Sequence, residues 1–183
     1  MIRTITVVAT FAASFVAAFA SCSTEPEEKA VAPVAPEPVE PEAKPDPYRT
    51  QAEALVAAID GGMDAGQLLV LADALTSTGM AMLPGLIEEH PACKEYLEAI
   101  AAVGGSLRDM PLADIETGYH NDGKLPTMPS ADCYHGKDLV VHPATVAAMA
   151  KLGLATDEER QSAKGEIVEV LGHLTAIEPQ KGE

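Results

Sequence analysis

The residues of this sequence best suited to chemistry gather between positions 119 and 142. This segment holds three of the five histidines, two of the four tyrosines and one of the three cysteines. Imidazole and carboxylate side chains together suit zinc, copper or iron, and an irregular loop can wrap around an ion without the fixed spacing of a helix. The sequence therefore indicates four candidate ligands of a transition metal: His120, Asp122, His135 and His142.

The same residues also have a purely structural interpretation. Asn121-Asp122-Gly123 is a turn sequence that needs no ligand. His142 directly precedes Pro143 and can simply be the residue at a helix N-terminus. Histidines and tyrosines of a long loop can also pack their apolar bodies on a core. No recognised metal motif is matched. A haem held by His or Tyr stays open, although the Cys-x-x-Cys-His run of covalent attachment is absent.

The N-terminal segment has the layout of an export signal. Arg3 supplies one positive charge, and residues 5–20 form an apolar run that is too short and too rich in Ala to favour a permanent spanning helix. The run ends at Phe19-Ala20-Ser21-Cys22, which resembles the lipobox of bacterial lipoproteins. The resemblance implies that residues 1–21 are removed and that Cys22 carries the lipid.

The same resemblance implies a destination for the protein. Ser23 follows the cysteine and would not retain the protein at an inner membrane, so an outer membrane, with the domain facing the periplasm, is expected. The alternative is conventional cleavage after Ala20, because Ala18-Phe19-Ala20 also fits such a site. That alternative would leave three cysteines in the exported chain, whereas lipidation of Cys22 leaves two.

Cys93 and Cys133 are the two cysteines that remain. An even number of thiols in an oxidising compartment favours one disulfide between them, which would tie the long loop to a helix. Two other roles for Cys133, a thiolate ligand or a nucleophile paired with His135, require a reduced thiol, which that compartment disfavours.

A linker separates the export signal from the domain. Residues 22–47 are rich in Pro, Glu, Ala and Val, a composition typical of an extended, polyproline-like tether. The net charge of the whole chain is −16, which repels phosphate and so argues against nucleic acid as a ligand. The same charge opposes attraction to anionic lipid, so we expect membrane association through the lipid anchor.

Residues 48–183 are expected to form a single all-α domain. Trp is absent and aromatic residues make up only 4% of the chain, which favours helices packed through aliphatic side chains. Apolar residues recur at helical spacing in about five segments, and we expect these to pack as an antiparallel bundle. The segments run from Tyr48 to Ile59, Asp64 to Leu75, Pro91 to Ala101, Pro143 to Ala150 and Thr156 to Leu174.

Local signals set the expected ends of these helices. Asp64 is a candidate N-cap, Thr156 and Glu159 have the spacing of a capping box, and Pro91 and Pro143 suit first helical positions. Glycine pairs at 61–62 and 104–105 are expected to end helices. Between 118 and 141 the periodicity is lost, which predicts the longest irregular loop of the domain, and such loops are usually functional or disordered.

Two classes of function follow. The preferred one is a tethered envelope lipoprotein whose domain contacts another envelope protein, in which case an apolar patch should remain exposed. The other is an exported metal- or haem-binding protein, in which His120, His135 and His142 should converge, with Asp122, Asp132 or Asp138 in support. A phosphate-binding glycine loop and a Gly-x-Ser-x-Gly elbow are both absent, so catalysis has no positive signal.

Overall fold

The computed structural model describes residues 46–177, and within that range every regular element is a helix. The prediction of an all-α domain is confirmed. The predicted export signal, the predicted lipidation site Cys22 and nearly all of the predicted linker at 22–47 lie outside the described residues.

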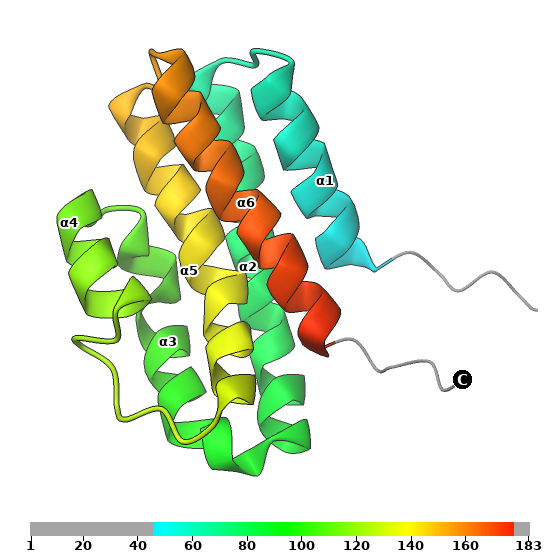
Figure 1. The fold of residues 1–183 in the computed structure, drawn as a ribbon, viewed down its shortest axis with the longest axis vertical. Helices are drawn as coiled ribbons and strands as arrows, with labels where there is room; N and C mark the ends of the chain where they lie inside the picture. Colours follow the sequence, from blue (N-terminus) through cyan, green and yellow to red (C-terminus); the bar gives the residue numbers. More distant parts are fainter. Residues whose placement is uncertain (1–45, 178–183) are drawn as a thin grey trace, which may run out of the picture. The chain divides into compact units, whose positions relative to one another are not determined.

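Four long helices lie side by side and surround the core (Figure 1). Each packs on the next, α1 on α2, α2 on α5, α5 on α6 and α6 on α1, so that the four close into a bundle. A fifth helix, α3, packs on α2 and α5 from outside this ring. These helices are α1 (Pro47–Asp60), α2 (Ala65–Glu89), α3 (Lys94–Leu107), α5 (Ala131–Leu152) and α6 (Asp157–Ile177).

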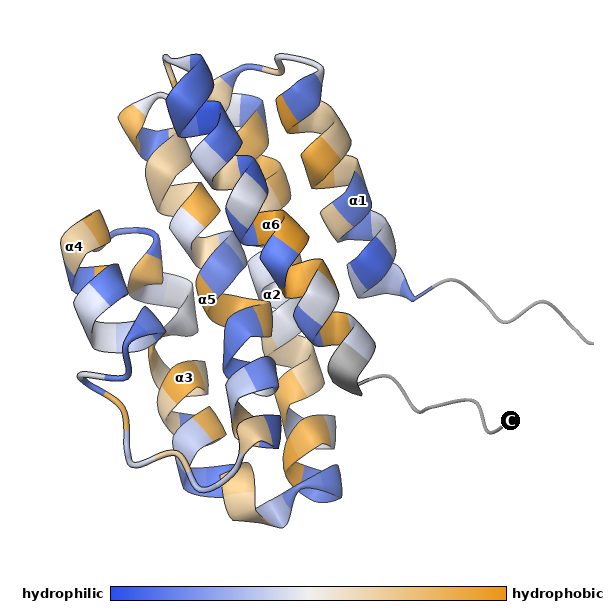
Figure 2. Ribbon diagram, viewed as in Figure 1, coloured by the Kyte–Doolittle hydropathy of each residue, from blue (hydrophilic) through white to orange (hydrophobic). Residues whose placement is uncertain are grey.

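Helix α5 is the centre of the domain. It contacts α2, α3, α6 and the short helix α4 (Leu112–Ile115), and it is buried on nearly every side. A helix apolar all round would satisfy such surroundings. Yet Figure 2 shows strongly hydrophilic positions along the lower, N-terminal half of α5. Lys137, Asp138 and His142 are all at most 2% exposed, so this half of the helix carries ionisable groups into the core.

Side chains close the helix N-termini where the sequence indicates. The carboxylate of Asp64 accepts a hydrogen bond from the backbone N–H of Gln67 at 3.0 Å. Thr156 and Glu159 form the reciprocal capping box, with bonds of 2.9 and 3.2 Å between each backbone N–H and the other's side chain. These two predictions are confirmed, and each cap satisfies backbone donors that the first helical turn leaves free.

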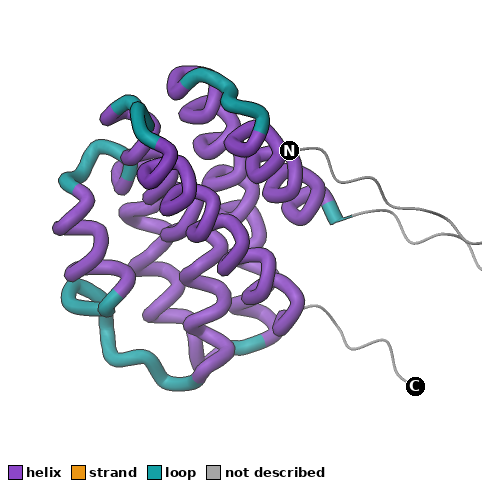
Figure 3. The backbone as a smooth tube through the Cα atoms, turned by 45° about the horizontal axis from the view of Figure 1, so that its top comes forward, coloured by secondary structure: helices purple, strands orange, loops and turns teal. Residues whose placement is uncertain are grey.

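Several helices are longer than the sequence predicts. Helix α2 continues past Leu75 and through Pro84 to Glu89, and α3 continues through Gly104-Gly105 to Leu107. The expected start of a helix at Pro143 is wrong, because Pro143 lies inside α5. Residues 131–141 are therefore helical, and the irregular segment is confined to 121–130 (Figure 3). Packing against neighbouring helices outweighs the local preferences of glycine and proline at these positions.

A side chain of another helix supplies the hydrogen bond that Pro143 removes from α5. Proline has no N–H, so the carbonyl of Leu139, four residues earlier, loses its helical donor. The buried hydroxyl of Tyr48 in α1 donates to that carbonyl at 2.8 Å. Gly79 of α2 makes room beside it, because a Cβ at that position would lie 2.1 Å from the same oxygen. Three helices thus meet at the carbonyl of Leu139.

A disulfide joins Cys93 and Cys133, in agreement with the pairing expected from the cysteine count, with an S–S distance of 2.06 Å. Cys93 ends the 3-10 turn η1 (Pro91–Cys93), and Cys133 lies in the first turn of α5. The bond therefore anchors the start of the central helix at the point where the irregular segment ends.

Among the described residues, α2 is the one helix long and apolar enough to cross a membrane, with a mean hydropathy of 1.4 over its best window. Core helices of soluble proteins pass the same test. A single helix of this kind is weak evidence for a membrane span, and α2 packs against α1, α3 and α5 in the bundle.

We predict that Tyr48→Phe lowers the free energy of unfolding by about 1–3 kcal/mol, because it leaves the buried carbonyl of Leu139 without a donor. Urea unfolding measures the loss. In a Pro143→Ala background the new backbone N–H can reach the same carbonyl, so the cost of Tyr48→Phe should be smaller there. Equal costs in both backgrounds would show that the hydroxyl does not replace the missing helical bond.

Loss of the disulfide, as in Cys93→Ser with Cys133→Ser, is expected to cost about 4 kcal/mol of stability by the loop-entropy estimate, because the bond closes a loop of 40 residues. Comparison of thermal unfolding of this double variant with that of the oxidised and the reduced parent checks the value. An oxidised parent no more stable than its reduced form would contradict the expectation.

Candidate metal centre

Ionisable residues of the neighbouring helices α5 and α6 face each other at the interface between these helices. On α5, His135, Asp138 and His142 follow one another at intervals of three and four residues, so they share one side of the helix. On α6, Glu166 and His173 are seven residues apart and also share a side. Contacts between the two sets place Glu166 beside His142, and His173 beside Asp138 and His135.

The most buried part of this cluster is formed by Asp138, His142 and His173. Nε2 of His173 lies 3.1 Å from one carboxylate oxygen of Asp138, and Nε2 of His142 lies 3.7 Å from the other. The two imidazole rings are stacked, with centroids 5.7 Å apart. None of these four nitrogen and oxygen atoms makes a hydrogen bond of acceptable geometry within the described part of the chain. Four potential ligand atoms therefore face one another inside the protein.

The other ring nitrogen of each histidine is held in place. Nδ1 of His142 lies 2.7 Å from a carboxylate oxygen of Glu166, and Nδ1 of His173 lies 2.9 Å from Nδ1 of His135. When a metal-binding histidine donates its far N–H to such a partner, the partner fixes the tautomer and directs the lone pair of Nε2 at the ion. The surroundings of His142 and His173 match that arrangement.

A second group of possible ligands lies on the other side of the His142 ring. His120, His142 and Glu166 offer one ligand atom each, all within 4.8 Å of one another. His120 ends η2 (Glu116–His120), a π-helical turn of a kind often found at functional sites. Its Nε2 lies 3.0 Å from the hydroxyl of Thr145 and 3.6 Å from Glu166. This group borders a surface cavity of about 280 Å³.

A buried lysine compensates part of the negative charge. The ammonium of Lys137 has no exposed surface and lies 2.9 Å from the carbonyl of His120, 3.1 Å from Asp122 and 3.6 Å from Asp138. It also lies over the ring of Tyr134, 4.4 Å from the centroid. A lone buried ammonium would be strongly unfavourable, so these contacts explain how Lys137 remains inside the bundle.

The backbone at Asp122 places its carboxylate beside the ammonium of Lys137. Its backbone has a φ of 59°, in the left-handed region that aspartate tolerates better than most residues. Its carboxylate accepts a bond from the hydroxyl of Tyr96 at 2.7 Å as well as the contact with Lys137. The turn at 121–123 thus brings a carboxylate to the ammonium group.

Burial and the carboxylates shift the pKa values of the histidines in different directions. Burial lowers the pKa of His142, but the contacts with Asp138 and Glu166 outweigh it and raise that pKa to about 9. Burial lowers the pKa values of His120 and His173, and the charge of His142 lowers them further. The cluster therefore favours a positive charge at His142, between two carboxylates.

The structure brings together only part of the expected ligand set. His120 and His142 fall in one possible ligand group. Asp122 is not part of it, because its carboxylate binds Tyr96 and Lys137. His135 is not part of either ligand group and contacts His173 through its Nδ1 atom. Asp138, expected only in support, lies among the ligand atoms.

Sequence reasoning missed Glu166 and His173. One signal was present. Both side chains are largely buried and both adjoin core positions of α6, namely Ile167 and Leu174. A glutamate and a histidine beside an apolar helical face, two turns apart, can point toward a shared partner inside a bundle.

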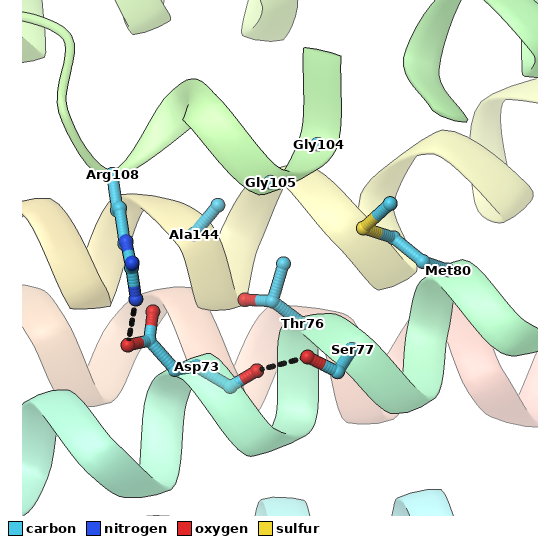
Figure 4. Close-up of a pocket in the computed structure, with 8 residues that line it drawn as sticks. All are labelled: Asp73, Thr76, Ser77, Met80, Gly104, Gly105, Arg108 and Ala144. Atoms are coloured by element: carbon cyan, nitrogen blue, oxygen red, sulfur yellow. Dashed lines mark hydrogen bonds and ion pairs between the residues drawn. The ribbon is translucent and has the colours of Figure 1, made fainter. Parts of the chain in front are cut away.

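Another cavity, of about 250 Å³, lies between α2, α3 and α5 (Figure 4). Its one basic side chain, Arg108, forms an ion pair with Asp73. Histidine and cysteine are absent from its lining. This cavity therefore offers no imidazole or thiolate ligand for a metal.

Comparison of the chain with protein-family models, with curated proteins and with solved structures finds no match in any of the three. The geometry of the site is therefore the basis for inferring a function.

We predict that Lys137→Met lowers the free energy of unfolding of chelator-treated protein by about 3–5 kcal/mol, because it removes the one ammonium in contact with the buried Asp138. Lys164→Met is the matched control. It breaks a partly exposed ion pair with Asp60 and should cost at most about 1 kcal/mol. Equal losses for the two variants would show that Lys137 contributes no more than a surface charge.

Proposed function

We propose that this chain is an exported metal-binding protein whose helical domain holds one divalent first-row transition metal at Asp138, His142 and His173. The observation that carries the proposal is the set of four buried ligand atoms that face one another without hydrogen bonds. Lys137 lies 3.6 Å from Asp138 and offsets part of its charge, but burying polar atoms that make no hydrogen bond still costs free energy. A cation among them would recover that cost, because it displaces the Nε2 proton that the metal-free cluster favours on His142, releases it to solvent, and then coordinates the carboxylate and both imidazoles.

The ligand types narrow the choice of metal. Two imidazoles and one carboxylate suit zinc, copper and iron, while the absence of thiolates disfavours metals that need soft ligands. A bare ion fits better than haem, because the stacked rings of His142 and His173 are only 5.7 Å apart and leave no room for a macrocycle between them. The arrangement supports binding, and we propose no reaction for it.

The lipid anchor belongs to the same proposal. Lipidation at Cys22 and the acidic linker at 22–47 would hold the metal-binding domain at an outer membrane, facing the periplasm. Support for this location comes from the lipobox resemblance and from the disulfide between Cys93 and Cys133, which suits an oxidising compartment.

The interaction module preferred on sequence grounds gains less support. It expects a continuous apolar patch, but only four large hydrophobic side chains are exposed within 46–177. They are Val70 on α2, Met128 in the irregular segment, Leu152 at the end of α5 and Val168 on α6. Metal binding is therefore the function that the geometry supports best, and an envelope partner stays a separate hypothesis.

The test is elemental analysis of the full-length protein, purified from membranes in detergent without a metal-chelating resin. We expect bound metal in the parent and loss of it in Asp138→Asn and in His173→Ala. His90→Ala is the matched control, because His90 lies away from the cluster, beside Asp132, and should leave metal content unchanged. Circular dichroism verifies that each variant is folded. A parent without metal after growth with added zinc, copper and iron would refute the proposal, as would full occupancy in folded His173→Ala.

A further inference from the structure

The imidazole of His142 faces a different carboxylate through each of its nitrogens. Nδ1 lies 2.7 Å from Glu166, and Nε2 lies 3.7 Å from Asp138. The two possible ligand groups, Asp138 with His173 and Glu166 with His120, therefore lie on opposite sides of one ring, and both include His142. An imidazole that has lost both N–H protons has one lone pair on each nitrogen, so it can bind two cations at once.

We propose that His120, His142 and Glu166 form a second metal position, which shares the His142 ring with the buried ion and opens to solvent. This inference rests on the proposed function, because the first ion takes the place of the Nε2 proton of His142 and leaves one N–H, at Nδ1 beside Glu166. On binding, the second cation takes the place of the proton that Nδ1 donates to Glu166, and that proton passes to solvent.

The contacts of His120 allow its Nε2 atom to exchange a hydrogen bond for a bond to a metal ion. The hydroxyl of Thr145 donates to the carbonyl of Val141 at 2.9 Å, so Nε2 of His120 donates its own proton to that hydroxyl at 3.0 Å. The His120 ring lies edge-on to His142, with centroids 4.9 Å apart. When the ion binds Nε2, the proton of the neutral ring moves to Nδ1. The exchange replaces one hydrogen bond to a hydroxyl with a bond to a cation.

The two positions differ in their access to solvent. Asp138 and His142 are buried, whereas His120 and Glu166 line the surface cavity of about 280 Å³, together with Glu116, Thr145 and Ser162. An ion held there by three protein ligands keeps a coordination position directed at the cavity. This is the difference between closed structural sites and open sites that bind water or a small molecule. The second position is therefore the one at which a small exogenous ligand would bind.

Metal titration of full-length protein stripped with a chelator tests the second position. With Cu²⁺ we expect two equivalents in the parent and in the His90→Ala control, and one in His120→Ala. If the parent binds one equivalent and His120→Ala also binds one, the second position is refuted while the proposed function stands. If the parent binds none, both fall.

Electron paramagnetic resonance tests the sharing of His142. Two Cu²⁺ ions bound to one imidazole couple magnetically, so we expect the parent signal to be weak at two equivalents and His120→Ala to give the ordinary signal of a single ion. Two independent signals in the parent would overturn the shared ring. Azide added to the copper-loaded proteins should alter the spectrum of the parent and not that of His120→Ala, and an equal response in both would show that the second position is not the open one.

Discussion

The rest of the structure depends on one constraint, which is that the charged residues buried on α5 must have partners inside the bundle. Lys137 and Asp138 are adjacent in sequence, both are almost completely buried, and both belong to the helix that α2, α3 and α6 pack against. Isolated charges in such a place would be neutralised or would unfold the domain. The partners supplied by α6, by the π-helical turn and by the segment at 121–130 are thus requirements of the fold as well as of the site.

The position of α5 is set by contacts made at its least regular point. Pro143 interrupts the helical hydrogen bonds, and the freed carbonyl of Leu139 becomes the acceptor for Tyr48 beside the close approach of Gly79. His142 directly precedes that proline. The feature that breaks the helix locally therefore also fixes the register in which α5 presents Asp138 and His142 to α6.

The site combines one closed side and one open side on a single imidazole. On the closed side, the carboxylate oxygens of Asp138 and the Nε2 atoms of His142 and His173 make no hydrogen bond among the described residues, and Lys137 lies 3.6 Å from Asp138. On the open side, His120 and Glu166 border a surface cavity of about 280 Å³. Buried ligands hold an ion firmly and exposed ligands let one exchange, so a shared ring could join a retained ion to an exchangeable one.

The sequence by itself determined the helical class, the caps at Asp64 and Thr156, and the residue types able to bind a metal, because these depend on composition and on neighbours a few positions away. Only the tertiary structure decided which residues meet. Asp138 and His173 are far apart in the chain, and helix packing alone brings them to 3.1 Å. The helical state of 131–141 was decided there too, because burial among four helices outweighs the weak local signal of a segment containing glycine, histidine and charged residues.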